Sequence, residues 1–483
     1  MSPKIAPMKP SLALRAAAFI AVALSLVGIR SWLTPPAEVQ AAPLAGEYQW
    51  VHDPSRVVKC GDAYYVFYTG NNILSRTSSD LTTWNRGTPV FEKMPDWVRE
   101  YVPNVKGNNI WAPDLIFFNN KYWLFYSVST FGSRVSAIGV ATTPTLDPKS
   151  PDYKWTDNGL VIASKQSSNW NAIDPAPLTD ERGDLWLTFG SFQRSGIQLV
   201  KLDSQTGKAV GEPKTLAARQ GVGPEAPYIH FHDGWYYIFE NEGFCCRGMN
   251  STYAAMVGRS KTITGPYLDK TGRDLATGGG TPFLGTEGEQ IGPGHIGVLS
   301  EGNLDRFTYH YYNSLANGVP TLGMQTLVWE KDGWPRVAKD LKPGRYAIIS
   351  KASGLALGIH DLSQEDGTPI DQFKYTGGPF QEWNVAPVGD GYFNISSLAT
   401  GKSIDLFECS SAEGTKISQY GWGNNDCQRW RIEPTSDGSY RILSKSTKNA
   451  ITLPGGTTAP QALVASYAPT GKIEQQWEFR PVP

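Results

Sequence analysis

Residues 221–248, GVGPEAPYIHFHDGWYYIFENEGFCCRG, contain the pattern that decides the fold. Glu225 stands between two prolines, and a polar turn, Asp233-Gly234, separates the segment 228–232 from the aromatic run 235–239. An Asp-Gly turn between two such runs is typical of a β-hairpin. The stretch therefore predicts a loop that leads into two antiparallel strands, with a carboxylate where the first strand starts.

The same layout occurs five times between residues 50 and 311. Each unit has a short polar motif, a turn with Gly, Asn or Asp, and an aromatic-rich run, while no segment keeps a helical period. The motifs are VHDP (51–54), WAPD (111–114), IDPAP (173–177), PEAP (224–227) and GPGH (292–295). Repeated hairpins of this size predict an all-β fold, the five-bladed β-propeller. The motifs would begin the innermost strands and face the central channel.

Polar side chains of the five motifs are expected to converge at this channel, each from the same position of its repeat. They are Asp53, Asp114, Asp174, Glu225 and His295. Carboxylates that share a site raise one another's pKa, an arrangement that serves catalysis better than stability. An isolated Asp-Pro pair is more often a turn, but five such motifs together favour a functional site. Asp114 is the weakest candidate, because a turn role explains it equally well.

Three of the acids suit the cleavage of a glycosidic bond, which uses a general acid and a second carboxylate. Glu225 lies among prolines and aromatics that would raise its pKa, as a general acid requires. Asp53, in a polar loop, suits a base that stays ionised, with His52 as its hydrogen-bonding neighbour. Asp174 would tune the pKa of Glu225 and hold its orientation.

Three histidines are candidate ligands. His295 stands in a Gly-Pro-Gly-His loop at the channel position, which favours a ligand-binding or water-holding role. His230 and His232 alternate on a predicted strand, as a metal-binding pair would. No third ligand is evident for them in the sequence, so we interpret the pair as ordinary strand residues.

The motifs together resemble glycoside hydrolase family 43, specifically its arabinan-degrading members. The segments HDP, WAPD, WNAIDPA, PEAPY, GFCCRG and VGRSKTITGPYLDKTGRD carry the resemblance, which covers residues 46–338. It implies a propeller that hydrolyses α-1,5-linked L-arabinofuranosidic bonds of arabinan with inversion at the anomeric carbon. By position, it implies that Asp53 is the general base, Glu225 the general acid and Asp174 the pKa modulator.

The resemblance also implies a cation and a sugar-binding cleft. His295 matches a histidine that contacts a bound cation, usually calcium, through water. Such an ion would stay mostly hydrated and organise the site. Substrate-contacting positions of the family match Trp111, Phe131, Asn171 and Arg247. The loops at 285–290 and 292–296 depart from the arabinanase pattern, so endo and exo action both stay open.

A different repeat begins after residue 343. Gln-x-Trp recurs at an identical interval, ending at Trp383, Trp430 and Trp477. Three equal repeats predict a β-trefoil over residues 344–482, with the three indoles in its core. This segment resembles the ricin B-type lectins, also called carbohydrate-binding module family 13.

The lectin resemblance implies one sugar-binding site, in the middle repeat. Asp405 and Tyr420 match the family's acid and stacking aromatic, and the other two repeats lack the acid. Cys409 and Cys427 lie in the same repeat and are the best candidate disulfide, which would make this site more rigid. A purely structural role for the trefoil stays open.

Bulk properties limit the partners. The chain has 483 residues, enough for two domains, and a net charge of −1, which favours neither nucleic acid nor an anionic membrane. Residues 1–42 place basic residues before an apolar run and predict a secretory signal or an uncleaved N-terminal anchor. We expect a secreted monomer that acts on plant cell-wall arabinan, periplasmic or membrane-anchored if the segment is kept. Five cysteines fit an oxidising compartment, with Cys245 and Cys246 either joined or free.

Two other readings of the function stay open. The same fold and acids serve an exo-acting arabinofuranosidase, a β-xylosidase, or a hydrolase of arabinoxylan or β-1,3-galactan, although the long arabinanase-like motifs favour arabinan. A non-catalytic carbohydrate-binding protein would be favoured if Asp53, Asp174 or Glu225 were replaced, and none is.

Overall fold

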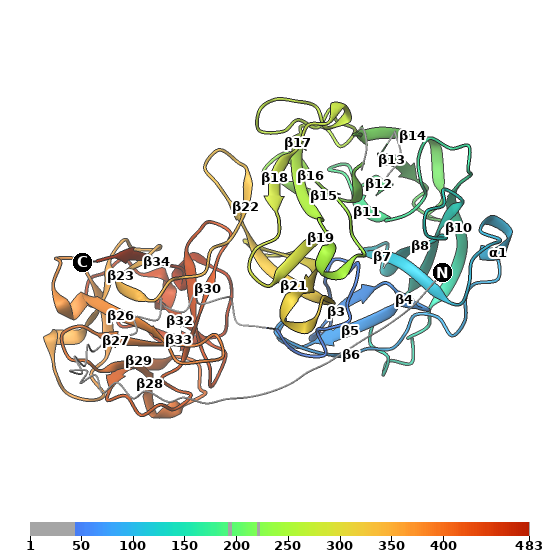
Figure 1. Cartoon of the computed structure of the whole chain (residues 1–483). Coiled ribbons are helices and arrows are strands. Elements are labelled where there is room, and N and C mark those ends of the chain that lie inside the picture. The colour runs from blue at the N-terminus through green and yellow to red at the C-terminus, as the bar shows by residue number, and fades with distance from the viewer. Residues whose placement is uncertain (1–43, 192–195, 220–222, 483) are drawn as a thin grey trace, which may run out of the picture. The chain divides into compact units, whose positions relative to one another are not determined.

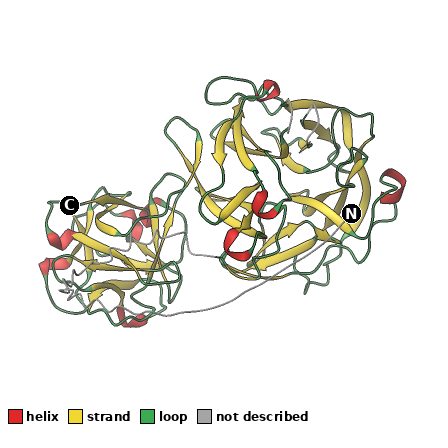
Figure 2. Ribbon diagram, in the orientation of Figure 1, coloured by secondary structure: helices red, strands yellow, loops and turns green. Residues whose placement is uncertain are grey.

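The computed structural model describes residues 44–191, 196–219 and 223–482. Strands dominate these residues (Figure 2), and their helical elements are one α-helix, α1 (Val98–Tyr101), and short 3₁₀ turns. In the described part of the chain, no helix has the length and hydropathy to cross a membrane. The predicted signal or anchor at residues 1–42 lies outside the described residues. The all-β prediction is confirmed.

Strands β1 to β22 form five sheets, one for each predicted repeat, and Figure 1 shows them following one another from blue to yellow. They are the blades of a five-bladed β-propeller, as predicted. Blades one to three comprise β1 (Ala45–Gly46), β2 (Val58–Cys60), β3 (Ala63–Tyr68), β5 (Leu74–Ser78) and β6 (Thr83–Arg86); β4 (Gly70–Asn71), β7 (Asn109–Phe118), β8 (Lys121–Val128), β9 (Ser136–Thr143) and β10 (Thr156–Ser164); and β11 (Ala176–Thr179), β12 (Leu185–Phe189), β13 (Ile197–Leu202) and β14 (Ala209–Ala217). Blades four and five comprise β15 (Glu225–His232), β16 (Trp235–Glu242), β17 (Ala254–Ser260) and β18 (Thr281–Leu284); and β19 (Gln290–Glu301), β20 (Leu304–Asn313), β21 (Val319–Trp329) and β22 (Pro335–Val337). The 3₁₀ turns η1 (Gly248–Asn250), η2 (Leu275–Thr277) and η3 (Ser314–Ala316) lie between strands.

The aromatic runs form the packing between blades. In the hairpin of β15 and β16, Tyr228 pairs with Phe239 across the sheet, and Tyr237 and Phe239 are fully buried. Both belong to a cluster that also holds Val298 and Phe307 of blade five. Burying one such side chain contributes about 1.5–3 kcal/mol. The alternation seen in the sequence therefore supplies the core between neighbouring blades.

Residues 48–51 close the ring against the last blade. The backbone N–H of Leu322, in β21, donates to the carbonyl of Tyr48 at 2.9 Å, and the N–H of Val51 donates to the carbonyl of Pro320 at 3.2 Å. These bonds join the segment before blade one to blade five. The propeller thereby closes on itself and leaves no open gap in the ring of blades.

A largely buried arginine, Arg56, whose side chain is 13% exposed, links the blades along the channel. Its backbone N–H and its guanidinium Nη2 donate to Asp114 of blade two, at 2.9 and 2.6 Å. Nη2 also donates to the Pro177 carbonyl of blade three, and the cation lies 4.7 Å from the centre of the Tyr228 ring in blade four. The Tyr228 hydroxyl donates to the Val298 carbonyl of blade five. Burial opposes the charge on Arg56, but Asp114 outweighs burial and raises its pKa.

Strands β23 to β34 form a single twelve-stranded sheet, the predicted β-trefoil. Its strands are β23 (Gly344–Ser350), β24 (Ala356–Ile359), β25 (Ile370–Phe373), β26 (Glu382–Pro387), β27 (Phe393–Ser397), β28 (Ser403–Leu406), β29 (Thr415–Tyr420), β30 (Trp430–Pro434), β31 (Tyr440–Ser444), β32 (Ala450–Thr452), β33 (Ala465–Tyr467) and β34 (Trp477–Pro481). Its 3₁₀ turns are η4 (His360–Leu362), η5 (Pro379–Gln381), η6 (Phe407–Cys409), η7 (Pro454–Gly456) and η8 (Ile473–Gln475).

The three Gln-x-Trp tryptophans hold equivalent positions in the trefoil core, as predicted. Trp383, Trp430 and Trp477 are almost fully buried in one cluster. Each indole N–H donates to a backbone carbonyl of the short strand in its own repeat, at 3.2, 2.9 and 3.1 Å. A buried indole needs such a partner, so the same contact is made three times.

Asp114→Asn should destabilise the propeller by about 3–5 kcal/mol, because Arg56 then stays charged and unpaired in a buried place. The free energy of opening is measured by hydrogen exchange on peptides from the blades. Asp184→Asn is the control, since Asp184 forms a partly exposed ion pair with Lys201 at 2.8 Å, and its loss should cost about 1 kcal/mol or less. Equal losses in the two variants would contradict this role of Asp114.

Candidate active site

One residue with left-handed backbone lies at the channel entrance of every blade. The φ angles are 48° at Asp53, 43° at Ala112, 55° at Asp174, 49° at Ala226 and 63° at His295. This conformation costs a non-glycine residue about 1–2 kcal/mol, and it clusters at functional sites. Its fivefold recurrence identifies the equivalent position of the five blades.

The acids do not all occupy that position, so the expectation of one shared position was wrong. Asp53, Asp174 and His295 are themselves left-handed residues, but Glu225 comes one residue before Ala226, and Asp114 comes two residues after Ala112. Strand irregularities follow at the same places in β7, β15 and β19. The motif position whose side chain points to the channel therefore differs from one blade to the next. Asp114 forms an ion pair with Arg56 instead of joining the other acids.

Asp53 lies at the centre of a group of imidazoles. Its Oδ2 is 2.9 Å from Nδ1 of His52 and accepts a hydrogen bond from Thr69 at 2.7 Å. Its Oδ1 is 3.5 Å from Nδ1 of His295 and 3.6 Å from Nδ1 of His310. Burial by itself raises the pKa of this carboxyl, but His52 and the two other histidines outweigh burial and hold it well below its usual range. Asp53 is ionised at neutral pH.

Glu225, the first residue of β15, has the opposite environment. Its side chain is 5% exposed, and its Oε2 accepts a hydrogen bond from Ser191 at 2.8 Å. Burial raises its pKa to about 7, against the opposing hydrogen bonds from Tyr253 and Ser191. The carboxyl therefore holds a proton up to nearly neutral pH, as a general acid must.

Asp174 lies against the Glu225 segment. Its Oδ2 accepts a hydrogen bond from the backbone N–H of Ala226 at 3.2 Å, and its own N–H donates to Ser127 at 3.3 Å. Burial raises its pKa well above the usual value, and Glu225 and Asp53 raise it further. Repulsion between carboxylates is mutual, so whichever of Asp174 and Glu225 ionises first raises the pKa of the other.

Two side chains of β20, His310 and Tyr312, complete the site and were missed in the sequence. Nδ1 of His310 accepts a hydrogen bond from the backbone N–H of Asp53 at 3.1 Å, and its ring stacks on His52 at 4.1 Å between centres. The Tyr312 hydroxyl lies 2.7 Å from Nε2 of His52. Both residues lie on the same strand face as Thr308, because every second residue of a strand shares a face. This spacing was visible in the fifth repeat of the sequence.

The histidines differ in protonation. Burial lowers the pKa of His295, and it lowers that of His310 further, so both imidazoles are neutral at neutral pH. Burial also works against a charge on His52, but the adjacent Asp53 outweighs burial and raises its pKa. The backbone N–H of His295 is held by the Asn241 side chain at 2.9 Å, which fixes the loop of the fifth blade.

The four predicted substrate contacts lie in different surroundings. Trp111 is half-buried in β7, whereas Phe131 is 82% exposed in the loop between β8 and β9. Asn171 is buried, and its side-chain oxygen accepts a hydrogen bond from Ser136 at 2.7 Å, so part of its bonding capacity serves the protein itself. Arg247 is exposed, with its cation 3.8 Å from the centre of the Phe244 ring.

Cys245 and Cys246 are joined as a disulfide between adjacent residues, a question that the sequence left open. The backbone N–H of Cys246 donates to the Tyr312 hydroxyl at 2.6 Å, and its sulfur lies 3.9 Å from Nε2 of His52. The Cys-Cys-Arg loop of blade four is thereby connected to the imidazole group around Asp53.

The trefoil places its candidate sugar residues on one sheet face. Asp405 pairs with Ser418 across β28 and β29, and Ser403 pairs with Tyr420, so Asp405 and Tyr420 are diagonal neighbours. Asp405 is 8% exposed and Tyr420 is 43% exposed. Burial raises the pKa of Asp405 to about 6, and Gln428 opposes the shift by a hydrogen bond. Cys409 and Cys427 form a disulfide in the same repeat.

Comparison with known proteins supplies the family. Residues 48–335, more than half of the chain, match the family described as "Glycosyl hydrolases family 43". Residues 329–420, 381–467 and 426–483 match the family described as "Ricin-type beta-trefoil lectin domain-like".

The relatives are arabinan-degrading enzymes by name. The chain is 41% identical over 308 residues to the "Extracellular endo-alpha-(1->5)-L-arabinanase 1" of Bacillus subtilis (strain 168), which covers 62% of this chain and 92% of the relative. It is 39% identical over 322 residues to an "Extracellular exo-alpha-(1->5)-L-arabinofuranosidase" of Cellvibrio japonicus (strain Ueda107), with coverage of 64% and 92%. The crystal structure of an exo-1,5-α-L-arabinanase from a bovine ruminal metagenomic library superposes with a TM-score of 0.58 at 43% identity, over 59% of this chain and 96% of the other. Together with the five blades and their acids, the match shows that this chain is a glycoside hydrolase and belongs to glycosyl hydrolases family 43, with a ricin-type β-trefoil following the propeller.

Proposed function

We propose that the chain hydrolyses α-1,5-linked L-arabinofuranosidic bonds of arabinan, with Glu225 and Asp53 as its catalytic pair. The observation that carries the proposal is the opposite shift of the two pKa values, with Glu225 raised to about 7 and Asp53 held low. Two carboxyl groups in these protonation states are what acid–base cleavage of a glycoside needs. The names of the Bacillus and Cellvibrio relatives support arabinan as the polymer.

In the proposed reaction, Glu225 gives its proton to the oxygen of the leaving sugar while the glycosidic bond breaks. A water molecule on the opposite side attacks the anomeric carbon, and Asp53 takes a proton from that water. The products are two sugars with free hydroxyls, and the anomeric configuration is inverted because water attacks directly. The next turnover requires Glu225 to regain a proton and Asp53 to lose one.

Asp174 acts on Glu225 in this proposal and not on the substrate. Its bond to the Ala226 N–H orients the segment that begins with Glu225, and the two coupled carboxyls resist losing both of their protons. His52 and Thr69 bond to the Asp53 carboxylate and favour its ionised form, and His310 holds the Asp53 backbone N–H.

A calcium ion, mostly hydrated, is proposed at His295. The donor set around Asp53 offers one carboxylate and several imidazoles, too few oxygens for the six to eight that calcium takes directly. His310 Nε2 and Asn241 Nδ2 are buried and have no hydrogen-bond partner among the described residues, so bound water could satisfy them. The residues therefore fit an ion that is held through water. When bound, it would add positive charge beside Asp53 and order the water around it.

Two further proposals concern place and targeting. The relatives are named extracellular, and two disulfides in the described residues suit an oxidising compartment, which supports secretion. The trefoil, through Asp405 and Tyr420, is proposed to hold the enzyme on plant cell-wall polysaccharide.

Endo and exo action both have a similar relative, so product analysis decides between them. On linear arabinan, an endo enzyme yields a ladder of oligosaccharides early in the reaction, and an exo enzyme yields one short product throughout.

Glu225→Gln should lower the rate by about 10²–10⁴-fold, because the amide cannot protonate the leaving oxygen. Release of sugars is measured by chromatography, with the anomeric configuration of the first product followed by NMR. Near-normal turnover of Glu225→Gln would refute the acid assignment, and faster release from arabinoxylan or β-1,3-galactan than from arabinan would refute the substrate.

The pH profile should fall on its alkaline side near pH 7. Glu225 must be protonated to act, so kcat/KM should drop about tenfold per pH unit above a pKa of about 7. On the acid side, kcat/KM should fall only at a pH below the usual pKa range of Asp, because the pKa of Asp53 is lowered.

Two variants test the causes of this profile. Ser191→Ala removes a hydrogen bond that favours ionised Glu225, so the alkaline limb should move up by about half to one pH unit. Asp174→Asn removes the carboxyl that is coupled to Glu225, so the limb should move down. A limb that stays in place in Asp174→Asn would contradict the modulating role.

Asp405→Ala should weaken retention on insoluble arabinan while activity on short oligosaccharides stays unchanged. Because the pKa of Asp405 is about 6, retention of the unaltered protein should also be weaker at pH 5 than at pH 7, where the carboxylate accepts hydrogen bonds from sugar hydroxyls. Depletion assays measure both effects, with Asp366→Asn as a control on the neighbouring acid. Equal retention of Asp405→Ala and the unaltered protein would leave the trefoil without the proposed site.

A further inference from the structure

The His-Phe-His segment of β15 has a third partner in the folded chain. Asp305, the second residue of β20 in blade five, lies beside His230 and His232 of blade four. Its Oδ2 is 3.6 Å from Nε2 of His230 and 3.5 Å from Nδ1 of His232. The interpretation of the two histidines as ordinary strand residues was therefore incomplete, because their partner comes from another repeat.

The distances match a metal site. A tetrahedral zinc ion, about 2.0–2.2 Å from nitrogen and oxygen ligands, holds those ligands about 3.3–3.6 Å apart. Both measured separations lie in that range, and the three ligand atoms all lie within 4.8 Å of one another. Little movement would be needed to bring them around one ion.

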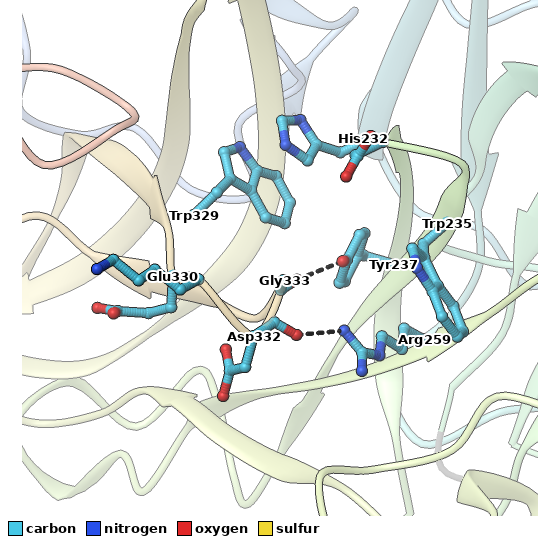
Figure 3. Close-up of a pocket in the computed structure, with 10 residues that line it drawn as sticks. His232, Trp235, Tyr237, Arg259, Trp329, Glu330, Asp332 and Gly333 are labelled. Atoms are coloured by element: carbon cyan, nitrogen blue, oxygen red, sulfur yellow. Dashed lines mark hydrogen bonds between the residues drawn. The ribbon is translucent and has the colours of Figure 1, made fainter.

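The ligands are also held in place by their neighbours. The indole N–H of Trp329 donates to Asp305 Oδ2 at 2.7 Å, and the Ser300 hydroxyl donates to Oδ1 at 2.6 Å. The His232 ring lies beside the Trp329 indole (Figure 3) and stacks on it, with centres 3.8 Å apart and planes 7° apart. Such outer contacts orient metal ligands before the ion binds.

The site has room for a further ligand and is distinct from the active site. The His232 side chain is 33% exposed, and all three ligands line a cavity of about 460 Å³, so water could take the fourth position. His232 is the last residue of β15 and Glu225 is the first. At about 3.3 Å per residue, the strand places them roughly 23 Å apart.

We propose that His230, His232 and Asp305 bind a zinc-class divalent transition-metal ion that joins blade four to blade five. Imidazole with one carboxylate suits zinc and its neighbours, whereas calcium needs more oxygens than the three residues offer. The ion stabilises the fold, because its ligands come together only when both blades are folded. It takes no part in the hydrolytic reaction.

The test uses the full chain, freed of metal with a chelator that is then removed, and zinc chloride as the probe. Calorimetric titration counts the bound equivalents, and anomalous diffraction at the zinc edge of zinc-soaked crystals locates them. Zinc could also bind at His52, Asp53 and His310, so variants assign each equivalent. His230→Gln and His232→Gln should each lose one equivalent, and Trp329→Phe should bind that ion about 10–100-fold more weakly.

His360→Gln is the matched control. His360 lies 2.6 Å from Asp371 in the trefoil and forms a His–Asp pair without a second imidazole, so its loss should leave the zinc count unchanged. Zinc should raise the melting temperature of the unaltered protein and of His360→Gln, but not that of His230→Gln. Retained arabinan hydrolysis shows that each variant is folded.

An anomalous peak between His230, His232 and Asp305 supports the proposal even if a histidine variant fails to fold. Zinc-soaked crystals without a peak there would overturn it. An unchanged zinc count in both folded histidine variants would overturn it as well.

Discussion

A buried positive charge in the channel constrains the arrangement of the blades. The guanidinium of Arg56 has several donors in fixed directions, and it bonds to blades two and three while its face lies on Tyr228 of blade four. A charge placed there is tolerated only because Asp114 pairs with it. Gly297 of blade five packs on the Arg56 backbone so closely that a Cβ would come within 2.5 Å of its nitrogen. All five blades are thus fitted around one residue.

This fit determines where the reactive groups lie. Asp53 precedes Arg56 by three residues, and Glu225 precedes Tyr228 by three residues, so the ion pair and its aromatic neighbour locate both acids. The acids then differ through their own surroundings. The His52 imidazole favours the charge of Asp53, whereas burial of Glu225 outweighs the hydrogen bonds from two hydroxyl groups and leaves it protonated at higher pH. Two carboxyls of one channel obtain different protonation states from different neighbours.

The sequence predicted what local patterns encode: five hairpin repeats, the acids at their starts, the trefoil and its buried tryptophans. It could not predict contacts between segments far apart in the chain. Asp114 was the weakest candidate among the motif acids, and nothing in the sequence indicated that it forms an ion pair with Arg56. No sequence pattern linked Asp305 to His230, because the two residues belong to different repeats and meet only where blade five packs against blade four.

The sequence also could not predict the left-handed backbone conformation at the start of each blade. The motifs align by their letters, yet the left-handed residues show that Glu225 stands one position earlier than Asp53 in its blade. His310 could have been predicted from the sequence, because it lies two residues before Tyr312 and therefore on the same strand face. It was overlooked because a histidine inside an aromatic run resembles a core residue.

The repeated indole bonds of the trefoil have a consequence for how it holds a polymer. Each repeat keeps its own Trp-to-carbonyl bond, but Gly358 and Thr452 stand where the middle repeat has Asp405. The core is therefore maintained independently of sugar binding, and a repeat can lose its acid without weakening the fold. Under the proposed role, the module holds polysaccharide at one point and gains no avidity from its symmetry. Under that role, release from one polysaccharide chain would break one attachment and not several at once.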